Sequence, residues 1–256
     1  MAFTLTDFKL WRSLASCWLA SMALATQAAD VQVAVAANFA GPMVPLAERF
    51  AASTGHQLKV SIGATGKFAA QIAAGAPFEV LLSADDTTPR KLVEQGLAVP
   101  GTAFAYATGQ LVLWSPQAGV VDDQGKVLSE GRFAHLALAN PKLAPYGQAA
   151  MQTLQAMGLA DKLAPKLVLG DSVAQTWQFV ATGNAELGFV ALSQVQVPGK
   201  PLAGSMWVVP ARLHSAIRQD AVLLKTGEKN PAAQAWLAFL KSAEAKAVIQ
   251  TWGYTP

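Results

Sequence analysis

Three apolar runs of this chain stop at a small or hydroxyl residue and pass directly into a helical pattern. They cover residues 33–38, 60–66 and 167–173. A strand that leads into a helix leaves the first backbone N–H groups of that helix unpaired, at the positive end of the helix dipole. Such helix starts bind anions without lysine or arginine. The pattern therefore predicts an α/β fold that captures a small oxyanion, and it does not indicate catalysis.

Strand-like and helix-like segments alternate three times in the first part of the chain. The third strand, within residues 78–82, is a continuous apolar run, as expected for a strand buried on both faces. This alternation favours a parallel sheet with right-handed crossovers. In the second part we expect a surface excursion at 115–131, a helix at 148–157 and a smaller sheet.

The strand expected at 221–224 is assigned back to the first sheet, so the chain would cross twice between two lobes. We predict that lobe I comprises residues 30–108 and 216–256, and that lobe II comprises residues 109–215. Ligands of such proteins lie in the cleft between lobes, at the carboxyl ends of parallel strands.

The first 29 residues have the layout of a secretory signal peptide. Lys9 and Arg12 precede an apolar stretch at 14–25, and small residues follow it. The stretch is too short to span a bilayer permanently. Cys17 lies in a segment that resembles a lipid-attachment box, but the apolar run continues beyond it, which favours cleavage near residue 28 or 29. We therefore expect a periplasmic protein.

The mature chain is expected to rely on a large core. Cys17 is the only cysteine, so no disulfide remains after cleavage. About 225 residues suffice to bury most of the apolar surface. The formal net charge of the whole chain is only +3, which argues against a nucleic-acid partner because such partners require a dense basic patch.

The candidate donors lie at the ends of strands or the starts of helices. Ala37 and Asn38 end the first strand, and Thr65 lies in a glycine-flanked turn after the second. Residues 63–67 are too short for a phosphate loop of nucleotide-binding proteins. Tyr146 precedes a helix, and Val173 follows a helix-capping position. Each of these residues also has an ordinary structural explanation as a cap or a turn.

A secreted hydrolase with Ser172 as its nucleophile is the alternative from another functional class. Ser172 follows Gly170 and Asp171, as in some lipase-type blocks, but a serine nucleophile needs an activated histidine. The three histidines lie in no recognisable partner motif, and no Gly-x-Ser-x-Gly elbow occurs. No group of ligands has the spacing of a metal site. A helix cap is the simpler interpretation.

The whole mature chain resembles the periplasmic molybdate-binding proteins of bacterial ABC transporters. The most specific segment is 71–85, QIAAGAPFEVLLSAD, and residues 35–39 (VAANF) and 185–191 (AELGFVA) also fit. The resemblance implies a type II periplasmic-binding-protein fold with mixed, mostly parallel sheets and a hinged cleft. It also implies binding of molybdate or tungstate, delivery to a membrane permease, no cofactor, no enzymatic activity and a monomer. Another oxyanion, such as sulfate or phosphate, remains the alternative ligand.

Matched to the family, the ligand donors are Ala37, Asn38, Thr65, Tyr146 and Val173. The resemblance implies donation through side chain and backbone at Asn38 and Thr65, and mainly through the backbone at the other three. Many family members have Ser at the positions of Asn38 and Thr65. Some have a tyrosine donor at the position of Ala191, whose side chain has nothing to donate, so one family contact is absent or replaced here.

Overall fold

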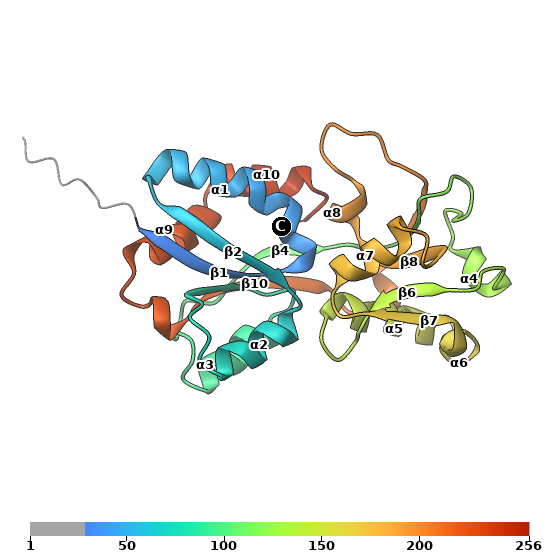
Figure 1. Ribbon diagram of the computed structural model, residues 1–256, viewed down its shortest axis with the longest axis horizontal. Helices are drawn as coiled ribbons and strands as arrows, with labels where there is room; N and C mark the ends of the chain where they lie inside the picture. Colours follow the sequence, from blue (N-terminus) through green and yellow to red (C-terminus); the bar gives the residue numbers. More distant parts are fainter. Residues whose placement is uncertain (1–28, 256) are drawn as a thin grey trace, which may run out of the picture.

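Two five-stranded sheets form the framework of the computed structural model, which describes residues 29–255 (Figure 1). The first sheet has the order β2-β1-β3-β10-β4 and the second has the order β7-β6-β8-β5-β9. We call each sheet with its helices a lobe. The residues of the predicted signal peptide up to 28 lie outside the described part of the chain.

The first lobe is built on a parallel core of three strands. β1 (Asp30–Ala36) pairs in parallel with β2 (Gln57–Gly63) and β3 (Val80–Leu82), while β10 (Ile217–Leu223) runs antiparallel to β3 and to β4 (Phe104–Gly109). The expected parallel pairing of the first three strands is therefore confirmed, although β3 is shorter than its apolar run.

Helices cover both faces of the first sheet. On one face lie α1 (Ala40–Thr54), α9 (Pro231–Leu240) and α10 (Ala243–Thr251), whose Phe50, Trp236 and Ile249 join the core over β1 and β10. On the other face lie α2 (Thr65–Ala73) and α3 (Thr87–Glu94), with Phe68 and Leu92 packed on the sheet. Burial on both faces explains why the central strands are continuously apolar.

The second lobe repeats this layered plan. β6 (Leu136–Ala139) pairs in parallel with β7 (Leu167–Gly170) and β8 (Leu187–Ala191), and β5 (Leu111–Ser115) runs antiparallel to β8 and to β9 (Ser205–Val208). One face packs against α5 (Pro145–Ala156) and the short helices α4 (Lys126–Glu130) and α6 (Ala160–Leu163). The other face packs against α7 (Val173–Ala181). A further short helix, α8 (Leu192–Val195), follows β8.

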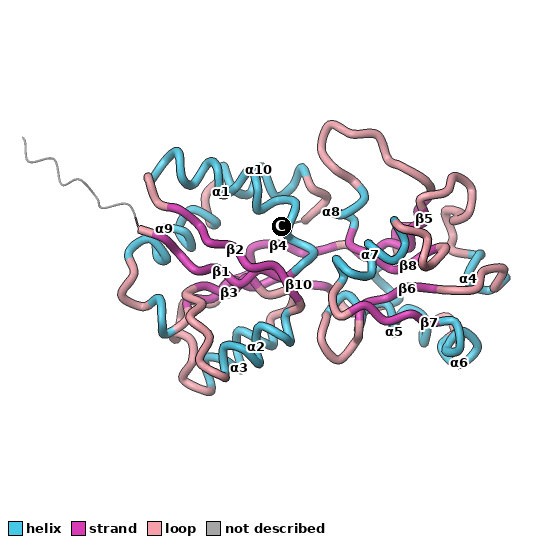
Figure 2. The backbone as a smooth tube through the Cα atoms, in the orientation of Figure 1, coloured by secondary structure: helices cyan, strands magenta, loops and turns pink. Residues whose placement is uncertain are grey.

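Two segments join the lobes side by side. β4 passes into β5 through Gly109 and Gln110, and a 3-10 turn at Ala211–Leu213 leads from β9 to β10. Gly109 pairs with Ile217, so the two crossing segments are hydrogen-bonded neighbours where they leave the first sheet. Figure 2 shows these strands bridging the two bodies of the molecule. The two-lobe fold with mixed sheets is confirmed.

Two local predictions were wrong. Segment 115–131 is not simply a surface excursion, because it contains α4 and buries Val121, Val127 and Leu128 in the second lobe. Helix α5 begins at Pro145, three residues earlier than expected, because proline suits the first turn of a helix. The earlier start places Tyr146 in the first turn. No helix between residues 29 and 255 is long and apolar enough to cross a membrane.

Candidate functional site

The five predicted donors line one small cavity between the lobes. Its wall combines the end of β1, the start of α2 and the starts of α5 and α7. The side chains are almost fully buried, with exposed fractions of at most 5 % for Ala37, Asn38, Thr65, Tyr146 and Val173. The free space within the cavity is about 10 Å³, roughly the room for one water molecule, so it excludes an extended molecule.

Three helix starts supply free backbone donors at this cavity. The first N–H groups of a helix have no partner within it, and no hydrogen bond within residues 29–255 uses the N–H of Thr65, Tyr146 or Val173. The positive ends of three helix dipoles therefore meet around one space. Such an arrangement stabilises a negative charge without a cation.

The hydroxyl of Thr65 is oriented as a donor by the main chain. Its Oγ1 accepts a hydrogen bond of 3.1 Å from the N–H of Ala84, which also lines the cavity. A hydroxyl that already accepts from a backbone amide keeps its own hydrogen for another partner. Thr65 thus offers both a hydroxyl and a backbone hydrogen at the same helix start.

The expected side-chain donation by Asn38 is wrong in this structure. Asn38 Nδ2 donates to Oε1 of Gln219 at 2.8 Å and to the hydroxyl of Tyr254 at 2.9 Å, so both its hydrogens are used within the protein. The Asn38 carbonyl accepts from Tyr254 and from Ser193 of the second lobe. The side chain therefore fixes the turn after β1, and only the backbone of Asn38 remains for a ligand.

The wall of the cavity is uncharged, and the charged groups lie on residues next to it in the sequence. Within the described chain, no acidic or basic side chain lines it. At the edge, Nζ of Lys67 in the first turn of α2 lies 2.7 Å from Oδ2 of Asp171, which precedes α7. This exposed ion pair joins the lobes. Beside it, the N–H of Gly66 donates to the carbonyl of Leu143 at 2.9 Å, a second contact between lobes.

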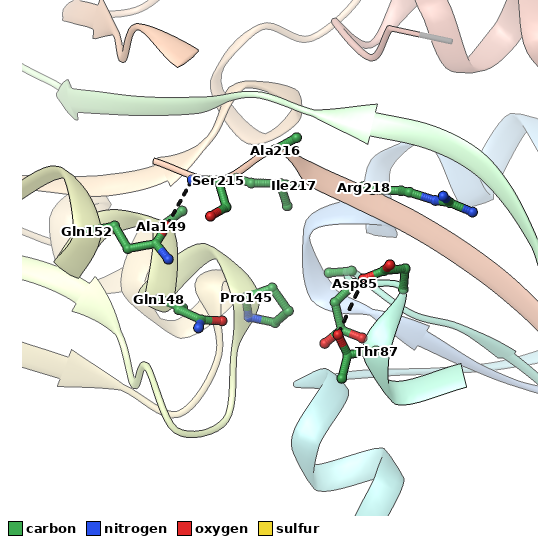
Figure 3. Close-up of a pocket in the computed structure, with 12 residues that line it drawn as sticks. Asp85, Thr87, Pro145, Gln148, Ala149, Gln152, Ser215, Ala216, Ile217 and Arg218 are labelled. Atoms are coloured by element: carbon green, nitrogen blue, oxygen red, sulfur yellow. Dashed lines mark hydrogen bonds between the residues drawn. The ribbon is translucent and has the colours of Figure 1, made fainter. Parts of the chain in front are cut away.

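A larger polar opening adjoins the cavity. This opening has a volume of about 230 Å³ and lies between α3, α5 and the start of β10 (Figure 3). Ala84 and Pro145 line both the opening and the cavity. On one side Gln152 of α5 accepts a hydrogen bond of 2.9 Å from the N–H of Ser215. Arg218, at the far end, is held by Asp220 at 2.7 Å and does not reach the cavity wall.

Buried tyrosines surround the deep side of the cavity. Burial raises the pKa of Tyr146 and of Tyr106 well above the usual value of a phenol, and it raises the pKa of Tyr254 to about 12. The nearby phenols raise the values of Tyr146 and Tyr106 further. All three phenols therefore stay neutral at ordinary pH and add no negative charge beside an anion.

Other candidate residues have structural roles. Ser172 caps α7, accepting from the N–H of Gln175, and no histidine between residues 29 and 255 hydrogen-bonds to it. Ala191 is fully buried and absent from the cavity wall, and its N–H donates to Gln194. Within the described residues, no group of three His, Cys, Asp or Glu side chains is arranged to hold a metal ion.

Comparison with known proteins places the chain in a family. Residues 31–255 match the bacterial extracellular solute-binding proteins. The chain belongs to this family. Its members are transport components and not enzymes, which confirms that expectation.

Among its relatives, the molybdate-binding protein ModA of Azotobacter vinelandii is 56 % identical over 97 % of this chain and 98 % of the relative. The protein of the same name from Rhodobacter capsulatus is 51 % identical over 91 % of each chain. A solved structure of the periplasmic molybdate-binding protein of Azotobacter vinelandii superimposes with a TM-score of 0.86, at 42 % identity, over 88 % of this chain and 99 % of that one. The predicted family resemblance is thereby confirmed.

Proposed function

We propose that this protein binds molybdate or tungstate in the periplasm and delivers it to the membrane permease of an ABC transporter. The main observation behind this proposal is the cavity between the lobes, whose wall consists of neutral donors from both of them. The names of the relatives that cover nearly the whole chain support the same ligand. In this proposal the anion is held by backbone N–H groups of Ala37, Asn38, Thr65, Tyr146 and Val173, with the Thr65 hydroxyl as a further donor.

Hydrogen bonds to a dianion account for tight binding without lysine or arginine. Each bond to a charged group contributes about 1.5–3 kcal/mol, so five or six of them are of the same order as the association cost of about 4–15 kcal/mol and can offset it. A wall of donors excludes a protonated oxyanion such as hydrogen phosphate, because its O–H would lack an acceptor. Sulfate carries no proton and is excluded by its smaller size.

Calorimetry on the mature protein tests this proposal with molybdate, tungstate, sulfate and phosphate. We expect Kd values for molybdate and tungstate at least roughly a hundredfold below that for sulfate, or about 2.7 kcal/mol. Equal affinity for sulfate or phosphate would make this a binding protein for another oxyanion. Absence of heat with every oxyanion would remove the anion site altogether.

The remaining parts of the proposal concern processing and assembly. We propose cleavage of residues 1–29, a lobe I of residues 30–108 and 216–256, a lobe II of residues 109–215, and a monomer in solution. The return of the chain to the first sheet with β10 supports this division. Mass spectrometry of the exported protein and light scattering measure the mature N-terminus and the mass of the particle.

A further inference from the structure

A buried polar cluster lies behind the cavity, where the lobes join. It consists of Asn38, Tyr106, Gln219 and Tyr254 from the first lobe and Tyr146 and Ser193 from the second, and we call it the hinge cluster. Gln219 is fully buried, and its Oε1 accepts from Asn38 and from Tyr106. A register shift in β10 between Gln219 and Asp220 accompanies this position, as β-bulges do where a strand re-aims a side chain.

Two atoms of the hinge cluster have no hydrogen-bond partner within the described chain. They are the hydroxyl oxygen of Tyr146 and Nε2 of Gln219. A Cβ placed on Gly109 would overlap the Tyr146 hydroxyl and lie 2.7 Å from Gln219 Nε2, so both atoms border the same small space. One is an N–H donor and the other an oxygen acceptor. Buried polar groups are rarely left unpaired, and these two are chemically suited to pair with each other, with the Tyr254 hydroxyl as a further neighbour of the phenol.

Tyr146 connects this space to the cavity. Its backbone N–H is free at the start of α5, in the cavity wall, whereas its phenol lies against Gly109 at the end of β4. Gly109 pairs with Ile217 of the other crossing segment. One residue of the second lobe therefore contacts the anion cavity with its main chain and the hinge with its side chain.

We propose that the Tyr146 phenol and the Gln219 amide are a positioning pair that couples an occupied cavity to closure of the lobes. The proposal rests on the function proposed above. An anion bound to the Tyr146 N–H holds the start of α5 against the first lobe, which seats the phenol beside Gln219. Opening the hinge separates the two groups. Their contact therefore exists in the closed form alone and slows release of the ligand.

The substitution Tyr146→Phe tests the pair without disturbing the anion contact. It removes the hydroxyl but keeps the ring and the backbone N–H. With molybdate as the probe, we expect release, followed by stopped-flow fluorescence, to become about tenfold faster, with the association rate changed less than twofold. If the hydroxyl is unpaired in every state, its removal leaves the release rate unchanged, and that result overturns the proposal.

Tyr106→Phe is the matched control. It removes a phenol from the same cluster, but the single hydroxyl hydrogen of Tyr106 is shared between Gln219 Oε1 at 3.0 Å and the carbonyl of Ser83 at 3.2 Å, both in the first lobe. We expect a lower melting temperature of the ligand-free protein and an unchanged release rate. A release rate as fast as that of Tyr146→Phe would show that the cluster acts through stability alone.

Gly109→Ala provides a rescue test. The added Cβ would overlap the Tyr146 hydroxyl and lie 2.7 Å from Gln219 Nε2. The double variant Gly109→Ala with Tyr146→Phe removes the first of these contacts and keeps the second, with the ring carbon of residue 146 at 3.0 Å. We expect Gly109→Ala to bind molybdate more weakly than the double variant does. If removing the Tyr146 hydroxyl speeds molybdate release by the same factor in the Gly109→Ala background as in the wild type, the phenol is not the obstacle at Gly109 and the proposal fails.

Failure of this inference is distinguishable from failure of the proposed function. A wild-type protein that does not bind molybdate refutes the function, and the same variants are then compared with the oxyanion that the protein does bind. If the wild type binds molybdate and Tyr146→Phe releases it at the wild-type rate, only the positioning pair is refuted. Tyr146→Phe adds no atoms, so it keeps the test valid if Gly109→Ala does not fold.

Discussion

Replacement of Thr65 by valine isolates the hydroxyl at the cavity, because valine has nearly the same shape. The Thr65 Oγ1 accepts from the N–H of Ala84, so its hydrogen is available to the anion. A hydrogen bond to a charged group contributes about 1.5–3 kcal/mol. At about 1.4 kcal/mol per factor of ten, its loss raises Kd for molybdate roughly 10- to 150-fold.

The same substitution also affects folding. The N–H of Ala84, a residue that is 2 % exposed, loses the only acceptor that it has within residues 29–255, and an unpaired buried donor costs about 1–3 kcal/mol. In a protein of this size about 1 kcal/mol corresponds to a change in Tm of roughly 2–4 °C. We therefore expect the ligand-free Thr65→Val variant to melt several degrees lower while remaining folded.

Calorimetry and thermal melting separate these two effects when matched variants are included. Thr65→Ser keeps the hydroxyl, so its Kd should remain close to that of the wild type. Thr153→Val removes a buried hydroxyl of α5 that donates to the carbonyl of Ala149, away from the cavity; it should change Tm but not Kd. Wild-type affinity of Thr65→Val, or an equal loss in Thr65→Ser, would refute the role of the hydroxyl.

Two further predictions concern closure and pH. Gly66→Ala places a Cβ 3.0 Å from the carbonyl oxygen of Leu143 in the other lobe. We therefore expect faster release of molybdate in stopped-flow measurements, with little change in the Tm of the ligand-free protein. An unaltered release rate would contradict a contact between Gly66 and Leu143 in the closed form. The raised pKa of Tyr254, about 12 in the folded protein, against about 10 for an unfolded phenol, means that its stabilising contribution is complete below pH 10 and is lost as the pH rises toward 12. The loss of stability between pH 10 and 12 amounts to about 3 kcal/mol. The free energy of unfolding in urea should therefore depend less on pH in this range for Tyr254→Phe than for the wild type. Identical pH profiles of the two proteins would count against the raised pKa of Tyr254.

Local signals explain why much of the fold was predictable. Gly55 ends α1 in the left-handed conformation with φ of 76°, which favours glycine. Pro231 follows the capping Asn230 at the start of α9. These effects act within a few residues, so they can be inferred from one sequence. The same holds for the helix starts at Thr65 and Val173, because strand, small residue and helix follow one another along the chain.

The hinge cluster could not be predicted for the opposite reason. Asn38 pairs with Gln219 and Tyr254 across 181 and 216 positions, and no local pattern marks these partners. The sequence indicated a donor in Asn38 but not that its hydrogens would be used inside the protein. A long-range partner of this kind follows only from the complete fold. The prediction for segment 115–131 was wrong for a similar reason, since its few apolar residues are buried by elements distant in sequence.

Because no charged side chain of residues 29–255 lines the cavity, the affinity for molybdate should depend little on salt concentration. A site that holds an anion with lysine or arginine weakens as ionic strength rises, because exposed charges are screened over about 8–10 Å. Here Lys67, two residues after Thr65, and Arg218, in the adjoining opening, are each paired with a carboxylate at 2.7 Å. The dipoles in the wall are buried and fixed by the helices, so salt hardly screens them. The molybdate Kd should therefore change little from low to moderate salt, and a steep dependence would place a free cation at the bound anion.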